Sequence, residues 1–126
     1  MGLFSSILGN VSEISASEAQ EELQPILVDG ETVLRAFHLF RDRFILTNRR
    51  ILSIDKEIVG TKRQVLSIPY ASIKKFSKES AGVFDLDAEL EIWLAGDEQP
   101  MKWQFSKGAN INEVYALLSK LVLEAH

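Results

Sequence analysis

The carboxylates Asp85, Asp87 and Glu89 occupy alternate positions, which is the spacing that begins a calcium-binding loop. Such a loop also needs glycine at its sixth position and a glutamate at its twelfth. Counted from Asp85, these two positions hold Leu90 and Gly96. Because both requirements fail, we predict the entry of a strand, where Asp85 or Asp87 bonds amide groups of a turn. No metal or other cofactor is expected.

Other groups with catalytic potential are few. His38 lies between two apolar residues, and the remaining histidine is the C-terminal His126. Neither has a partner at the spacing of a metal site or a catalytic triad. Gly60-Thr61-Lys62 contains only part of a phosphate-binding loop motif. The absence of cysteine excludes thiol chemistry and is typical of a cytoplasmic protein. We therefore predict a structural role for His38 and no enzymatic activity.

Positive charge is concentrated in the centre of the chain, although the net charge is −4. Residues 41–78 carry a net charge of +7, and the remaining residues carry −11. The overall negative charge argues against nucleic-acid binding. The basic centre could bind a lipid head group or an acidic peptide, pair with a neighbouring subunit, or simply be solvated. The candidate residues for an anion or a partner are Arg41, Arg43, Arg49, Arg50, Lys62, Arg63, Lys74 and Lys75.

The N-terminal segment has helical spacing. Apolar residues recur at helical intervals through residues 3–14. Ser15 and Glu18 form a capping box that begins a short helix, and Pro25 ends it. These signals predict two parts, an N-terminal helical extension in residues 1–28 and the main domain in residues 29–126.

After the Asp29-Gly30 turn the hydrophobic period changes to two, which is typical of strands. A helical pattern returns after Asn110, which can cap the helix together with Glu113. Seven short strands cannot lie flat over one helix, so we expect a barrel or an orthogonal sandwich with the last helix over an open end. The predicted strands are Thr32–Phe40, Arg43–Thr47, Arg50–Asp55, Gln64–Pro69, Ser72–Ser80, Ala88–Ala95 and Met101–Ser106.

Both faces of the first predicted strand are largely apolar. Val33, Phe37 and Leu39 alternate with a second apolar set, whereas one face of a small antiparallel barrel normally contacts water. Either a second subunit or residues 3–24 of the same chain must therefore cover the outer face. The candidate oligomer interface consists of Leu34, Ala36, His38, Phe40 and Trp93.

Several short motifs occur in a fixed order along the chain: Phe40-Arg41-Asp42-Arg43-Phe44, Leu46-Thr47-Asn48-Arg49-Arg50, Gly60-Thr61-Lys62, Ser67-Ile68-Pro69-Tyr70 and the segment from Ala81 to Leu90. Together they resemble the bacterial pleckstrin-homology family. The resemblance implies a mainly β, PH-like barrel of about seven antiparallel strands plus a C-terminal α-helix. It also implies ring-shaped homo-oligomers and no established ligand. The first hairpin is short, so the phosphoinositide binding of some eukaryotic members is not carried over.

The sequence thus predicts a non-catalytic binding or scaffold module whose partner is a second copy of itself, with a further protein or peptide partner left open. The alternative is a peripheral membrane or anionic-lipid binding module. It is based on the basic centre and the apolar stripe of Leu3, Phe4, Ile7 and Leu8. This alternative ranks lower, because the stripe contains no Lys or Arg.

Overall fold

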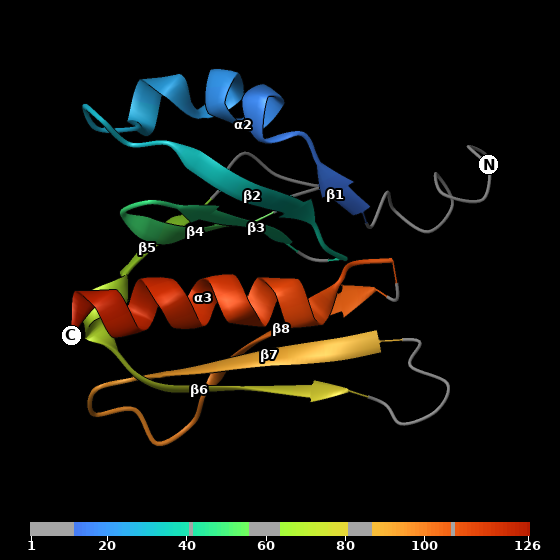
Figure 1. Ribbon diagram of the computed structural model, residues 1–126, viewed down its shortest axis with the longest axis vertical. Coiled ribbons are helices and arrows are strands. Elements are labelled where there is room, and N and C mark those ends of the chain that lie inside the picture. Colours follow the sequence, from blue (N-terminus) through green and yellow to red (C-terminus); the bar gives the residue numbers. More distant parts are fainter. Residues whose placement is uncertain (1–11, 41, 56–63, 81–86, 107) are drawn as a thin grey trace. The chain divides into compact units, whose positions relative to one another are not determined.

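The computed structural model describes residues 12–40, 42–55, 64–80, 87–106 and 108–126 (Figure 1). Contacts divide the chain into two units, residues 1–68 and residues 69–126. The first unit contains a five-stranded sheet and the second a three-stranded sheet, with one α-helix described in each. The predicted mainly β fold with an N-terminal and a C-terminal helix is confirmed. The domain boundary at residue 28 stays a prediction.

The sheet of the first unit has the strand order β1-β2-β3-β4-β5. Strands β2 and β3 form an antiparallel hairpin in which His38 pairs with Arg43 near the turn and Val33 pairs with Thr47 at the far end. Strand β2 ends at His38, two residues before the predicted end, because the amide of Leu39 donates to the Asp42 carbonyl and closes the turn. The strands are β1 (Ser12–Ile14), β2 (Val33–His38), β3 (Asp42–Thr47), β4 (Arg50–Asp55) and β5 (Val65–Pro69).

Strand β1 replaces part of the predicted N-terminal helix. Residues 3–11 of that prediction lie outside the described residues, but for Ser12–Ile14 it is wrong. These residues pair antiparallel with β2, where Ile14 is opposite Ala36. Pairing gives the backbone groups along the edge of β2 hydrogen-bond partners. A short apolar pattern does not by itself distinguish a strand from a helix.

Helix α2 (Ala16–Leu23) begins and ends where the sequence predicts. Ser15 Oγ accepts a hydrogen bond from the Glu18 amide at 3.3 Å, which confirms the predicted cap. A 3₁₀ turn, η1 (Gln24–Ile26), contains Pro25 and ends the helix. The buried face of α2 packs on the sheet in one cluster. Its buried members are Ala19, Leu23, Val33, Ala36, Ile45, Leu52 and Ile54.

A β-bulge in β2 changes which side chains face the helix. The register with β3 shifts between Val33 and Arg35. Strict alternation places Val33 and Ala36 on opposite faces, whereas both belong to the cluster beneath α2. The extra residue of the bulge moves Val33 to the face of Ala36. The predicted division of the first strand into two faces is therefore wrong at its beginning.

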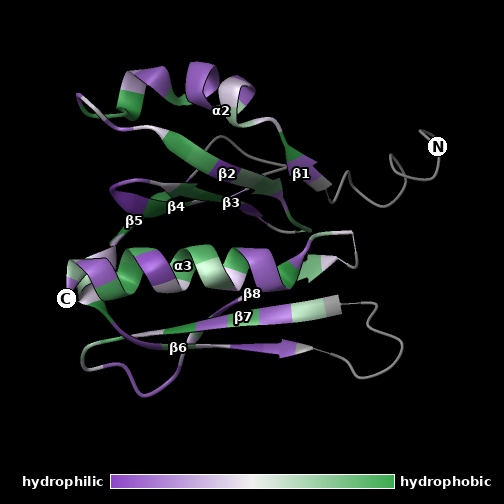
Figure 2. Ribbon diagram, viewed as in Figure 1, coloured by the Kyte–Doolittle hydropathy of each residue, from purple (hydrophilic) through white to green (hydrophobic). Residues whose placement is uncertain are grey.

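The second unit places a long helix on a small antiparallel sheet. Helix α3 begins at the predicted cap, where Asn110 Oδ1 accepts from the Glu113 amide at 3.3 Å. Its alternating hydrophobic and hydrophilic residues are visible in Figure 2, and it buries Val114, Leu118 and Val122. No helix within the described ranges is long and apolar enough to cross a bilayer. The elements are η2 (Tyr70–Ser72), β6 (Ile73–Ser80), β7 (Asp87–Leu94), β8 (Met101–Ser106) and α3 (Ile111–Ala125).

Candidate functional site

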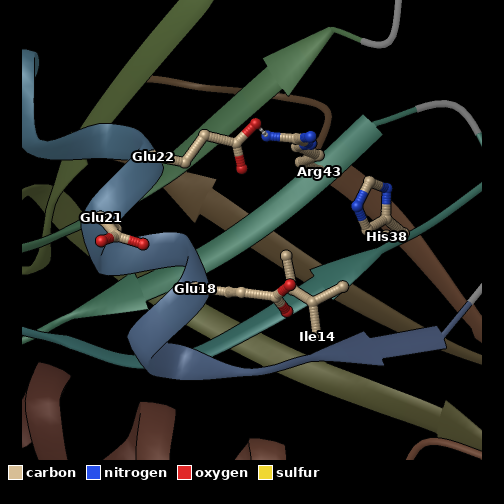
Figure 3. A pocket seen from close by; sticks show the side chains of 6 residues that line it. All are labelled: Ile14, Glu18, Glu21, Glu22, His38 and Arg43. Atoms are coloured by element: carbon tan, nitrogen blue, oxygen red, sulfur yellow. Dashed lines mark ion pairs between the residues drawn. The ribbon is translucent and has the colours of Figure 1, made fainter.

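A pocket of about 450 Å³ opens in the first unit between α2 and strands β1 to β3 (Figure 3). Three of the residues that line it are glutamates at positions i, i+3 and i+4 of α2, a spacing that places them on one side of the helix. The strands supply the rest of the lining. The described lining residues are Glu18, Glu21 and Glu22 from α2, Ile14 from β1, His38 from β2 and Arg43 from β3.

A helix cap and the pairing of three strands position these side chains. The Ser15 cap sets the first turn of α2 and thus the direction of its glutamates. The hairpin register places His38 directly opposite Arg43 near the β2–β3 turn. Pairing between β1 and β2 brings Ile14 beside the same end of the hairpin. The pocket is therefore a product of the sheet register and not of one sequence motif.

Negative charge dominates the pocket. Arg43 Nη1 lies 3.0 Å from Glu22 Oε2, and this ion pair is drawn as a dashed line in Figure 3. One pair leaves the carboxylates of Glu18 and Glu21 in excess over the cations of the lining. Among the described residues of the lining there is no hydroxyl or thiol nucleophile. Its excess carboxylates and the apolar Ile14 suit a cationic group on an aliphatic stem, such as an arginine or lysine side chain.

The predicted anion-binding residues are not gathered at one place within either described unit. Arg43 lies in the pocket, whereas Arg49 lies in the turn at the opposite end of β2 and β3. Lys74 and Lys75 are exposed on β6 of the second unit, where Lys75 Nζ lies 4.7 Å from the ring centroid of Trp93. Three further candidates lie outside the described residues, namely Arg41, Lys62 and Arg63.

Arg50, one of the predicted anion-site residues, connects several segments of the first unit. Its Nε donates to Glu31 Oε2 at 2.9 Å, and its Nη2 donates to Glu31 Oε1 at 3.0 Å. Nη2 also donates to the Ile26 carbonyl and Nη1 to Ser67 Oγ, both at 2.9 Å. The guanidinium therefore joins β4 to the segment after α2 and to β5. Its role in an anion site stays a prediction.

Glu31, which the sequence reasoning missed, is the partner that holds Arg50. Its side chain is fully buried and also accepts bonds from the Val28 amide at 3.0 Å and from Thr47 Oγ1 at 2.7 Å. Burial alone raises the pKa of this carboxyl. The hydrogen bonds from Arg50, Val28 and Thr47, together with the charge of Arg50, outweigh burial and leave the pKa below its ordinary value.

The predicted interface residues have different environments. Ala36 has no exposed surface and lies beneath α2, which is the cover by residues 3–24 that the sequence left open. Leu34, His38 and Trp93 are half-buried. Phe40, just after β2, is 74% exposed. Only Phe40 among these residues presents a large apolar surface to solvent.

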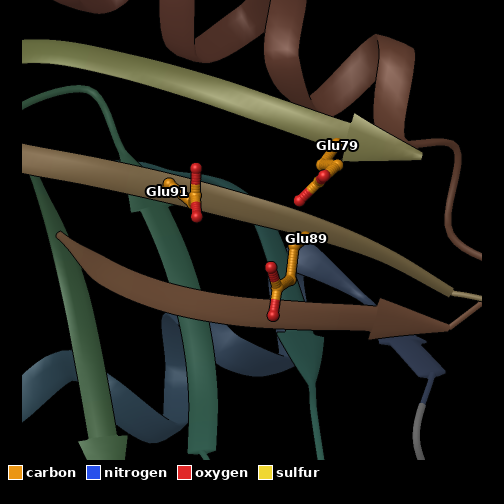
Figure 4. A group of neighbouring side chains, drawn as sticks. All are labelled: Glu79, Glu89 and Glu91. Atoms are coloured by element: carbon orange, nitrogen blue, oxygen red, sulfur yellow. The ribbon is translucent and has the colours of Figure 1, made fainter. Parts of the chain in front are cut away.

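A second group of carboxylates lies on the three-stranded sheet (Figure 4). The carboxylate oxygens of Glu79, Glu89 and Glu91 are within 4.8 Å of one another. Glu91 already accepts a hydrogen bond from Ser77 at 2.9 Å and lies 3.6 Å from Lys102 Nζ. Of the three acids first considered as calcium ligands, Glu89 belongs to this group, and the side chain of Asp87 is not described. Asp85 lies outside the described residues.

Comparison with known proteins identifies the family. A family model described as the bacterial PH domain matches residues 2–122. The uncharacterized protein YjqA of Bacillus subtilis strain 168 is 44% identical over 125 residues, which cover 98% of this chain and 100% of that protein. The uncharacterized protein YozO of the same strain is 31% identical over 95% of this chain and 96% of its own length.

Solved structures agree with this result. A DUF1696 family protein with a pleckstrin-homology domain from Shewanella loihica PV-4 superposes with a TM-score of 0.80. It is 34% identical, and the match covers 89% of this chain and 97% of that one. The predicted resemblance and the PH-like fold are thus confirmed. These matches indicate no catalytic family.

Proposed function

The chain belongs to the bacterial PH domain family, and from this premise we propose that it is a non-catalytic scaffold module that assembles with copies of itself. The family resemblance favours ring-shaped homo-oligomers. The pocket beside α2, whose described lining has excess carboxylates and no hydroxyl or thiol, is suited to binding a cationic side chain. The cytoplasm is the proposed location, since the chain has no cysteine.

The exposure of Phe40 is the observation that carries this proposal. Phe40 lies in the turn between β2, which ends at His38, and β3, which begins at Asp42, and it is 74% exposed. A phenylalanine side chain has only two torsions, so little side-chain entropy is lost when a second subunit covers the ring. Aromatic residues of this kind are enriched among the few side chains that dominate the energy of an interface.

Light scattering at micromolar concentration is expected to give a discrete oligomer for the wild-type chain. Substitution of Phe40→Ser is expected to raise the dissociation constant at least about tenfold, because the apolar anchor is lost. The matched control is Leu123→Ser on α3, where Leu123 is 70% exposed. It removes a similar apolar side chain and should leave the assembly unchanged. A wild-type monomer at every concentration would contradict the proposed function.

A further inference from the structure

The turn between β3 and β4 is held rigidly by its neighbours. Asn48 Oδ1 accepts from the Thr32 amide at 2.7 Å, and Asn48 Nδ2 donates to the Gly30 carbonyl at 3.1 Å. Thr47 Oγ1 accepts from the Arg49 amide at 3.0 Å. These bonds fix the backbone on both sides of Arg49. A side chain that projects from such a turn loses less freedom on binding than one on a mobile loop.

Arg49 presents a positive charge on this turn. Arg49 is exposed, and its guanidinium has no ion-pair partner among the described residues. This distinguishes it from Arg43 and Arg50, whose guanidinium groups are paired with glutamates. A free guanidinium on a preorganised turn is suited to bidentate binding of carboxylates.

The pocket beside α2 offers the complementary surface. Its volume of about 450 Å³ falls within the range of about 300–1,000 Å³ typical of small-ligand sites, so a guanidinium can enter. The carboxylates of Glu18 and Glu21 exceed the cations of the lining, and Ile14 can contact the aliphatic stem of an arginine.

The turn and the pocket lie at opposite ends of the same hairpin, so one copy cannot join them within itself. Arg43 pairs with His38 at the pocket end, and Thr47 pairs with Val33 at the Arg49 end. At about 3.3 Å per residue, the four steps along β3 place these ends roughly 13 Å apart. A contact between unlike surfaces of identical chains is heterologous, and it closes into a ring or continues as a filament.

We propose that the Arg49 guanidinium of one copy docks into the pocket of the next copy, against Glu18 and Glu21. This inference rests on the proposed self-assembly and names the polar contact that directs it. Phe40 lies at the pocket end of the hairpin and supplies apolar area to the same junction. The ionic part of the contact is sensitive to salt, because screening at 0.15 M acts over about 8 Å.

Charge reversal of each surface tests the contact. Arg49→Glu reverses the charge on the turn. The double substitution Glu18→Lys with Glu21→Lys reverses the charge of the pocket. Each change is expected to raise the dissociation constant of the assembly at least about tenfold in 50 mM NaCl. The combination of all three substitutions in one chain is expected to restore assembly. Lys74→Glu, at an exposed lysine of the second unit, is the matched control and should have no such effect.

Light scattering and sedimentation velocity measure the assembly, and circular dichroism verifies folding of each variant. If the wild type assembles and the reversed variants assemble equally well, this contact is excluded while the proposed function stands. If each reversal weakens assembly but the combined variant is not restored, the two surfaces do not meet, and the inference is also overturned. A monomeric wild type overturns the proposed function itself.

Discussion

Substitution of Arg50→Met is expected to lower the free energy of unfolding by about 3–5 kcal/mol, because it leaves the buried Glu31 carboxylate without its counter-charge. The lost interactions include both bonds to Glu31 and those to the Ile26 carbonyl and Ser67 Oγ. Methionine retains much of the side-chain length, so the loss reports on charge and hydrogen bonds more than on packing. Urea denaturation measures the change.

Lys74, exposed on β6 of the second unit, provides the control for this prediction. Lys74→Met removes a positive charge from an exposed position and should change the free energy of unfolding by no more than about 0.5 kcal/mol. A double variant, Glu31→Gln with Arg50→Met, should recover part of the loss, since no buried charge remains. Equal stability of wild type and Arg50→Met would exclude a stabilising role for the pair.

The same carboxyl makes the stability depend on pH. The folded-state pKa of Glu31 lies below its ordinary value, which is about 4.3 in an unfolded chain. The stability that ionised Glu31 contributes to the fold is therefore complete above the unfolded pKa. It is lost as the pH falls through the folded pKa. Glu31→Gln should remove this part of the acid sensitivity. Denaturation curves of wild type and variant between pH 6 and pH 3 are expected to converge as the pH falls.

Short-range signals in the sequence predicted the helix ends, the turn and the strand positions of this fold. The Ser15 and Asn110 caps, the Pro25 helix end and the Gly30 turn each depend on residues within three or four positions. Alternation located β2 to β8 within one or two residues for most of their bounds. The PH-like architecture came from several motifs in a fixed order.

Long-range pairing accounts for what the sequence did not reveal. Glu31 is separated by 16 residues from Thr47 and by 19 from Arg50, so alone it has the appearance of a solvated acid after a turn. The glutamates of α2 likewise have the pattern of an exposed helix face. Only the register between β1, β2 and β3 places them beside Arg43 and His38.

Substitution of Ala36→Asp distinguishes the two covers that the sequence left open for the first strand. Ala36 has no exposed surface and packs in the cluster with Ala19 and Leu23 of α2. A carboxylate there has no room and no counter-charge in this apolar cluster. The variant is therefore expected to lose at least about 3 kcal/mol of unfolding free energy. Ala95→Asp, at an exposed position after β7, is the matched control and should be nearly neutral.

The two possible covers of Ala36 differ in how the loss of unfolding free energy depends on protein concentration. If α2 covers Ala36, the substitution destabilises each chain by itself, and the loss measured by urea denaturation is the same at every protein concentration. If a second subunit were the cover, the substitution would act through assembly, and the difference from wild type would vanish on dilution to monomers. The buried cluster beneath α2 predicts the first result. It assigns Ala36 to the core of the first unit and leaves Phe40 as the apolar residue of the predicted interface that is free to meet a partner.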